Sequence, residues 1–597
     1  MYGSQNPTQS EQMSNRDFGR TIRGVPAPSE APGNRPDSPP SEGKGKQCAD
    51  SLIQNMLQEG GAGLIKFLLK AAVSSTDARG KIPNVSKVRE WQYRDLMRLP
   101  KAVQEEWKTA CKEELEALHW CNVFKLTNLP KGRKIIGCRW VFDVKSDGQK
   151  KARLVAQGLS QVEGIDFNEL FSPVVCFESV QLIFALSAIE NYYCVSVDVR
   201  NAYPYGKLDE EIYMRQPQGF IARGQEKKVI CLQCALYGLK QAGLAWWKEL
   251  NSSMKSLGFQ RLLSDADLFV CKDYKEIIIA IVYVDNAMFF GKDKVRIDQK
   301  KKLFIDKWEC RDLGEVKEFL HMHITCNGQT IKLDQCAHLD KVLECFSMTN
   351  AKSAPTPLPS NWVPKLAEGK ASSELLRTYQ SIIGSLLYLM IGTRPDMAYA
   401  VTKLVQFAAN PSQEHLNSAK YICCYLAGTK DSSIVYDGKT AKGIAAYTDS
   451  DWASDPITRW SVTGYFFKLA GGPITWQSQA QTTVAHSSTE AEYMVMSDCS
   501  HQVSWIRNIF CGLSMHLGPF PVYGDNQGSI FIGSNPVQEI CTKHIDLKYH
   551  YVCECIAKGK IEVFFVPSED NTANILTKNL GCIKFEKFRA ELGLEFK

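Results

Sequence analysis

The chain has 597 residues, of which 44% are hydrophobic and 10% aromatic, so several domains with substantial cores are expected. Its 71 basic and 65 acidic residues give a formal net charge of +6, which permits a nucleic-acid partner without requiring one. The 21 cysteines follow no framework spacing and the N-terminus shows no signal-peptide pattern. These features favour an intracellular protein, in the cytoplasm or the nucleus, that is not secreted.

The predicted elements begin after a low-complexity leader. Residues 1–80 open with a stretch rich in Ser, Pro, Gly and Asn, which cannot bury enough apolar surface to order itself, so we expect disorder there. "EEWKTACKEELEALHW" has helical periodicity, and "KIIGCRWVFDVKSDGQKKARLVAQG" predicts a hairpin with Asp147-Gly148 as its turn. The apolar run Ile277–Val284 predicts a strand, because it is far too short to span a bilayer, and no membrane partner is expected. A helical stretch is expected from about residue 372 to residue 428.

Two aspartates follow similar apolar runs in the first half of the chain. Asp198 stands near the end of "CVSVDV", and Asp285 follows "IVYV". If the two strands are neighbours in one sheet, the carboxylates converge and need cations between them. Two divalent ions about 3.5–4 Å apart would suit an in-line phosphoryl displacement. Mg²⁺ fits oxygen ligands best, with Mn²⁺ as an alternative. The competing interpretation is two surface turns with ordinary aspartates.

A second acidic set lies in the last third of the chain. A strand ends at Asp449 in "IAAYTDSDWA", a helix begins near Glu490, and Asp525 follows another strand in "PVYGDNQGSIFI". One acid from each element can form a cage for two metals that hydrolyse a phosphodiester. We interpret Asp451 and Glu492 as nearby acids outside this cage. "HSSTE" also predicts an ordinary helix start with a Ser or Thr cap.

Several longer motifs occur along the chain in the same order as in a known protein family. "GCRWVFDVK", "VDVRNAYPYGKLDEEIYMRQPQGF", "CALYGLKQAGLAWW" and "IVYVDN" resemble the reverse transcriptase of copia-type (pseudoviral) LTR retrotransposons. "YTDSDWA", "SSTEAEY", "GDNQGSI" and "NILTK" resemble the RNase H of the same elements. We therefore expect the reverse transcriptase and RNase H part of a Pol polyprotein. Zinc-knuckle, integrase and protease patterns are missing from the sequence.

The resemblance implies a multidomain α+β or α/β fold. We expect a right-hand polymerase with fingers, palm and thumb, followed by a connecting region and an RNase H-like mixed-sheet domain. The expected parts are a disordered leader (1–80), a reverse transcriptase (91–350), a linker and connecting region (351–440), an RNase H-like domain (441–580) and a C-terminal tail (581–597).

The resemblance also implies roles for the acids. Asp198 and Asp285 take the places of the polymerase acids that bind metal. Asp449, Glu490 and Asp525 take the first three acidic places of the RNase H, which cuts the RNA strand of an RNA–DNA hybrid. All five are thus candidate catalytic residues and metal ligands.

Four further residues match substrate-binding positions of the family. Lys151 and Arg153 in "KARLV" resemble fingers residues that grip the triphosphate, a task that suits the guanidinium fork. Tyr203 stands where the family places an aromatic gate against the ribose 2′-OH. Gln241 in "YGLKQ" resembles the residue beside the nascent pair. The alternative for Lys151, Arg153 and Gln241 is a solvated surface.

The sequence departs from the family at both acidic sites. Asn286 stands where the polymerase hairpin carries a second aspartate, and Asn574 stands where the RNase H carries its fourth acid. Leu244 stands where the family commonly has Arg. Each Asn keeps the shape of the acid and loses its charge. We expect weaker metal binding and chemistry slower by about 10²–10³-fold, by analogy with the loss of one preorganised electrostatic group.

The expected function is RNA-directed DNA polymerase with RNase H of a copia-type retrotransposon, degenerate and of reduced or no activity. The alternative is a non-catalytic, domesticated or relic protein that binds RNA–DNA hybrids. Expected partners are an RNA or DNA template-primer, RNA–DNA hybrid, deoxynucleotides and Mg²⁺. The sequence leaves the oligomeric state open.

Overall fold

The structure is a computed structural model that describes residues 91–144, 148–273, 276–440, 443–534 and 546–596. The leader predicted over residues 1–80 lies outside the described residues, as does Asp147 of the predicted hairpin turn. Within the described ranges, no helix is both long and apolar enough to cross a membrane.

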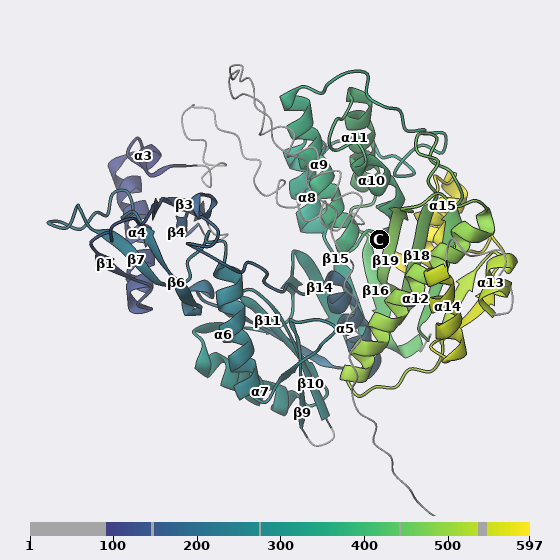
Figure 1. The fold of residues 1–597 in the computed structure, drawn as a ribbon, viewed down its shortest axis with the longest axis horizontal. Coiled ribbons are helices and arrows are strands. Elements are labelled where there is room, and N and C mark those ends of the chain that lie inside the picture. The colour runs from purple at the N-terminus through teal and green to yellow at the C-terminus, as the bar shows by residue number, and fades with distance from the viewer. Residues whose placement is uncertain (1–90, 145–147, 274–275, 441–442, 535–545, 597) are drawn as a thin grey trace, which may run out of the picture. The chain divides into compact units, whose positions relative to one another are not determined.

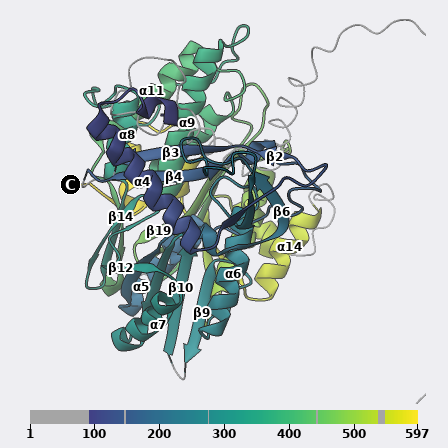
Figure 2. The same cartoon turned by 90° about the vertical axis from the view of Figure 1, so that its left-hand side faces the viewer.

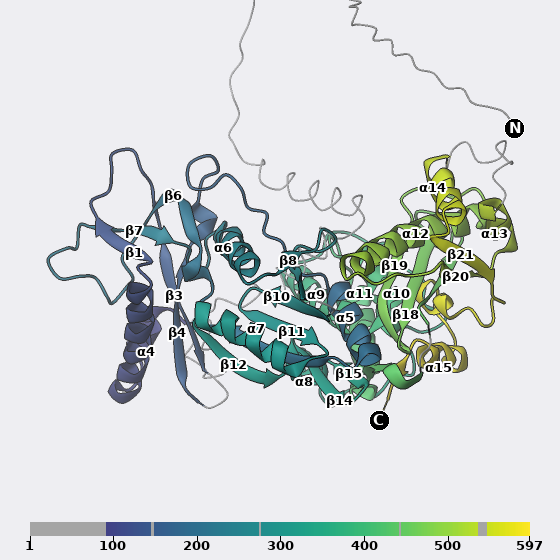
Figure 3. The ribbon, with the colours of Figure 1, turned by 90° about the horizontal axis from the view of Figure 1, so that it is seen from below.

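The first described elements pack a helix on a two-stranded ribbon. Helix α4 (Lys101–Trp120) lies beside β3 (Cys138–Val144) and β4 (Lys150–Ala156), which pair antiparallel (Figure 3). Buried Trp107 of α4 meets Phe142 of β3 edge to face, with ring centroids 5.3 Å apart. The predicted helix and hairpin are therefore confirmed. A sheet of order β1-β7-β6-β2 completes this part, with α3 (Tyr93–Leu96), β1 (Phe124–Thr127), β2 (Ile135–Ile136), β6 (Lys207–Met214) and β7 (Val229–Cys234).

A six-stranded sheet of order β12-β5-β11-β10-β9-β8 follows. Alternate side chains of β11 enter two cores, as strand geometry requires. Phe289 packs among residues of α6 and α7, whereas Phe290 meets Phe184 of α5 on the other face. β9 and β10 run side by side as an antiparallel pair (Figure 2). The elements are α5 (Phe177–Glu190), β5 (Tyr193–Val199), α6 (Ala242–Ser256), β8 (Gln260–Arg261), β9 (Leu268–Asp273), β10 (Glu276–Tyr283), β11 (Asn286–Gly291), α7 (Lys294–Lys307) and β12 (Cys310–Glu315).

A third sheet and a helical region come next. The sheet has the order β13-β14-β15-β16-β22, so it joins strands from distant parts of the sequence. The helical stretch predicted from about 372 to 428 is confirmed as three helices. The elements are β13 (Glu318–Phe319), β14 (Met322–Asn327), β15 (Thr330–Asp334), α8 (Cys336–Cys345), α9 (Ser373–Gly392), α10 (Ala398–Val405), α11 (Gln413–Gly428) and β16 (Ser433–Asp437).

The last sheet is mixed, with the order β19-β18-β17-β20-β21. β17, β18 and β19 are antiparallel, whereas β20 and β21 run parallel to β17. Long helix α12 packs on β17 and β18 and lies beside α14 (Figure 1). The elements are β17 (Ala445–Asp451), β18 (Val462–Leu469), β19 (Gly472–Ala480), α12 (Ser488–Gly512), β20 (Phe520–Gly524), α13 (Gln527–Ser534), α14 (Asp546–Ala557) and β21 (Ile561–Phe565).

The C-terminal residues are integrated into this architecture. The short 3₁₀ helix Thr572–Leu576 packs on β17 and β18, and α15 (Cys582–Glu591) follows it. β22 (Leu594–Glu595) pairs with β16, so residues after 580 form part of a sheet. The multidomain α+β fold class with an RNase H-like mixed sheet is as predicted.

Candidate functional site

The six-stranded sheet brings Asp198 and Asp285 together. Asp198 is near the end of β5, and Asp285 lies in the two-residue turn between β10 and β11. β11 pairs with β5 so that Asn286 lies opposite Asp198, and the Val199 amide donates to the Asp285 carbonyl over 2.6 Å. Both carboxylates are only partly exposed. The convergence expected from neighbouring strands is present in the structure.

The turn that carries Asp285 is strained. Val284 has φ +53°, a region that β-branched residues rarely adopt. A positive φ at the first central residue of a two-residue hairpin is typical of a type II′ turn, where Gly is usual. The indole Nε1 of Trp246 in α6 donates to the Val284 carbonyl over 2.7 Å and holds this turn. Strain of this kind costs about 1–3 kcal/mol and persists where the surroundings over-determine it, often at functional sites.

Asn286 faces the acids without adding charge. Its Nδ2 donates to Asp285 Oδ1 over 3.3 Å. Burial raises the pKa of Asp285, and Asp198 raises it further, whereas Arg153 and Lys151 oppose the rise. A second carboxylate at position 286 would add to this repulsion, and a bound cation would offset it.

Cationic side chains face the same two acids from β4. Lys151 and Arg153 are two residues apart and lie on one face of the strand. Burial raises the pKa of Asp198, and the charges of Lys151, Arg311 and Arg153 counteract that rise. Sequence reasoning missed Arg311, which is paired opposite Asp198 from β12. Only the pairing of strands remote in sequence reveals it.

An aromatic pair borders the pocket. Tyr203 lies close enough to Asp285 for the carboxylate to add to the burial that raises the tyrosine pKa. Its ring meets that of Tyr237 edge to face, with centroids 4.8 Å apart, and the Arg153 guanidinium lies 5.6 Å from the Tyr237 ring centroid. Tyr237 was not predicted, although it stands in the quoted motif "CALYGLKQ".

Gln241 is buried and supports the surrounding loops. Its Oε1 accepts from Gln161 Nε2 over 3.0 Å, and its Nε2 donates to the Asp166 carbonyl over 2.7 Å. Only 5% of the residue is exposed. These bonds join the start of α6 to the segment after β4, and a contact with substrate remains a prediction.

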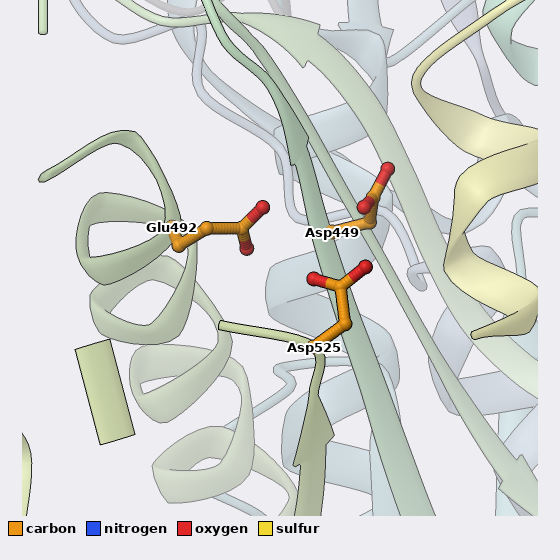
Figure 4. Close-up of side chains that lie close together, drawn as sticks. All are labelled: Asp449, Glu492 and Asp525. Carbon is orange, nitrogen blue, oxygen red and sulfur yellow. The ribbon is translucent and has the colours of Figure 1, made fainter. Parts of the chain in front are cut away.

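The mixed sheet forms a second acidic cluster. Asp449 lies on β17, Glu492 on α12 and Asp525 directly after β20. One carboxylate oxygen from each residue lies within 4.8 Å of the others, and the three side chains face one another (Figure 4). The Ser450 amide donates to Glu492 Oε1 over 2.9 Å, which fixes the helix acid against the strand.

The helix acid in this cluster is Glu492, so the prediction of Glu490 is corrected. Glu490 lies in the first turn of α12, where its Oε2 accepts from the His486 amide over 2.8 Å. Its own amide donates to the Ser487 hydroxyl, so the predicted cap of "HSSTE" is confirmed. Two residues rotate a helix by about 200°, which turns Glu492 toward the sheet when Glu490 faces the cap.

The three carboxylates of the cluster repel one another, and a bound cation would relieve this repulsion. Burial raises the pKa of Glu492 well above its usual value, and Asp449 and Asp525 raise it further. Burial also raises the pKa of Asp449, whereas Lys578 and Thr577 lower it. Oxygen ligands at this spacing are the donor set that Mg²⁺ prefers. The three carboxylates therefore fit a divalent ion.

Asn574 is buried beside this cluster, with 1% of its surface exposed. Its Nδ2 donates to the carbonyls of Ser568 and Asn571 over 2.8 and 2.7 Å. Its Oδ1 is buried and accepts no hydrogen bond among the described residues. A buried acceptor without a donor is rare and suits a cation or an ordered water as its partner.

Comparisons with known proteins identify the family of the chain. Residues 121–360 match the family described as "Reverse transcriptase (RNA-dependent DNA polymerase)". The chain is 37% identical over 500 residues to the retrovirus-related Pol polyprotein from transposon TNT 1-94 of Nicotiana tabacum, over 81% of this chain and 37% of that polyprotein. It is 31% identical over 305 residues to the putative transposon Ty5-1 protein of Saccharomyces cerevisiae, over 51% of this chain and 98% of that protein.

The chain therefore belongs to the reverse transcriptases of copia-type retrotransposon Pol polyproteins. It spans little more than a third of the tobacco relative, at 37% of its length. A solved structure of the foamy viral protease-reverse transcriptase in complex with double-stranded DNA aligns with a TM-score of 0.42 and 13% identity, over 89% of this chain and 84% of that chain.

Proposed function

We propose that this chain is an RNA-directed DNA polymerase with an RNase H activity, and that both activities are impaired by Asn286 and Asn574. The observation that carries this proposal is the pairing of Asp198 with Asn286 beside Asp285. The pocket keeps two acids and its cationic face but lacks the third carboxylate that the family places there.

Each group in the polymerase pocket has a distinct task. Asp198 and Asp285 would hold Mg²⁺, which offsets charge on the phosphates and on the primer 3′-oxygen when bound. Lys151 and Arg153 face the acids and would bind the triphosphate. Tyr203 lies beside Asp285 and would exclude a ribose 2′-OH.

The second cluster supports hydrolysis of the RNA strand of a hybrid. Asp449, Glu492 and Asp525 present converging oxygens for a divalent ion. The Ser450 amide and the Thr577 hydroxyl fix two of these carboxylates, so little reorganisation is needed when the ion binds.

Primer extension tests the polymerase proposal. Asn286→Asp should raise the extension rate about 10²–10³-fold over the parent chain, since it returns one charged group to a preorganised site. Asn327→Asp, at an exposed position outside the pocket, is the matched control for added charge and should change nothing. A parent chain already as fast as Asn286→Asp would refute the impairment.

A second candidate function is binding of RNA–DNA hybrids without turnover. The observation that favours it is that both pockets lose an acid while Lys151, Arg153 and Lys578 remain. A chain that binds labelled hybrid tightly, yet neither extends a primer nor cleaves RNA after Asn286→Asp and Asn574→Asp together, would establish this alternative.

A further inference from the structure

A lysine side chain of the protein, Lys578, contacts Asp449 in the second acidic cluster. Lys578 Nζ lies 3.5 Å from Asp449 Oδ2, and the Thr577 hydroxyl donates to the same oxygen. The side chain of Lys578 is 35% exposed, whereas that of Asp449 is 2% exposed. Lys578 thus reaches from solvent to a buried carboxylate, and one oxygen of Asp449 is already engaged by the chain.

The contact between Lys578 and Asp449 limits the number of metal ions that Asp449 can bind. A carboxylate that gives one oxygen to each of two ions needs both oxygens free of other partners. Oδ2 of Asp449 has two partners in Thr577 and Lys578, so an ion shared with Glu492 and Asp525 either uses the other oxygen or competes with these two side chains. A second ion would have to displace the ammonium, and no carboxylate at position 574 offsets that displacement.

The charges of the site also favour a single divalent ion. Asp449, Glu492 and Asp525 together carry three negative charges when ionised. One divalent ion and the Lys578 ammonium together supply three positive charges. Two divalent ions with the ammonium would supply five, in a pocket where burial makes unbalanced charge costly. The amide of Asn574 provides an acceptor without charge.

We propose that this site binds one divalent cation, and that Lys578 supplies the second positive charge at the scissile phosphate. An ammonium has three donors, so a contact to Asp449 leaves others for phosphate oxygens. This inference rests on the proposed RNase H function. In the competing interpretation, Lys578 only balances the negative charge of the cluster before the metal binds. The two interpretations predict different effects on cleavage when the ammonium is removed.

Metal binding is measured first, by Mn²⁺ titration of the full chain followed by electron paramagnetic resonance and calorimetry. Asp198→Asn and Asp285→Asn are present throughout, so that the polymerase pocket does not contribute. We expect one Mn²⁺ that is lost in Asp525→Asn, and a second Mn²⁺ only after Asn574→Asp is combined with Lys578→Met. Two ions in this parent would overturn the inference. No ion at all would instead refute the proposed function.

Cleavage of a labelled RNA–DNA hybrid is then measured in the same background. Lys578→Met should bind Mn²⁺ more tightly, because a repelling charge is gone, and yet cleave about 10²–10³-fold more slowly. Lys578→Arg should restore most of the cleavage. Lys584→Met, at an exposed position in α15, is the matched control. Tighter metal binding with unchanged or faster cleavage would show that Lys578 is only a counter-ion.

Discussion

At the scale of single residues, Asn286 and Asn574 each use the side-chain amide as a hydrogen-bond donor. Asn286 donates to Asp285, where an aspartate would repel it, and Asn574 donates to two carbonyls. Under the proposed impairment, an amide at each position would repel nearby acids less than a carboxylate and would attract a cation less. Loss of a strained, charged site commonly raises stability at the expense of activity.

Glu492 and Glu490 provide a test at this scale. Glu492→Gln should abolish hybrid cleavage, whereas Glu490→Gln, which alters a contact in the first turn of α12, should retain it. Burial and two neighbouring acids raise the pKa of Glu492 in the folded chain, so its contribution to the free energy of unfolding is lost as pH rises through that pKa. Metal-free Glu492→Gln should therefore gain stability over the parent as pH rises above about 4.5, the ordinary pKa of a glutamate.

Urea unfolding at several pH values, together with a hybrid cleavage assay, checks this prediction. Glu490→Gln serves as the control for both measurements. Loss of cleavage in Glu490→Gln, with full activity in Glu492→Gln, would show that Glu490 is the catalytic glutamate.

At the scale of elements, a buried ion pair ties the loop after β17 to helix α10. Lys403 Nζ lies 3.3 Å from Asp455 Oδ2, and both side chains are at most 4% exposed. Asp455 Oδ1 also accepts from the amides of Ile457 and Thr458 over 2.9 and 3.0 Å. The connecting helices thus position the loop that follows Asp449 and Asp451.

Lys403→Met should lower the free energy of unfolding by about 3–5 kcal/mol, because it leaves the Asp455 carboxylate buried without its cation. Adding Asp455→Asn should recover part of that loss. Lys558→Met, which breaks the exposed pair with Glu554, should leave the free energy of unfolding almost unchanged. Urea unfolding measures all three, and equal effects of Lys403→Met and Lys558→Met would contradict a structural role for the buried pair.

At the scale of the whole molecule, the net charge of +6 is small for a chain of 597 residues. The proposed binding of nucleic acid would therefore depend on local concentrations of positive charge, such as Lys151, Arg153 and Arg311 around the acids of the six-stranded sheet. Each phosphate contact releases counterions, so the logarithm of the affinity falls with the logarithm of salt by about 0.9 per contact on a duplex.

Lys151→Met or Arg153→Met should each reduce that slope by about one when the hybrid is bound together with an incoming deoxynucleoside triphosphate, the proposed ligand of both side chains. Lys370→Met, at an exposed position in the linker, should leave the slope unchanged. Fluorescence anisotropy with a labelled hybrid and a saturating triphosphate gives the slopes. Unchanged slopes in both fingers variants would place the triphosphate elsewhere on the chain.

Motifs and periodicity alone were sufficient for much of this protein. Sequence motifs indicate the family and the mixed fold class. Local periodicity predicts the β3–β4 hairpin and the helices between residues 372 and 428, because each element carries its own pattern of apolar and polar residues. The proximity of Asp198 and Asp285 was also predictable, because two similar strands ending in acids become neighbours in one sheet.

Only the tertiary structure decided which side chains complete each pocket. Glu492 replaces Glu490 because the facing side of α12 depends on where its cap sets the first turn. Arg311 and Lys578 reach their acids through contacts between segments more than a hundred residues apart in the sequence. Such contacts arise when remote elements are packed against one another, and no local pattern encodes that packing.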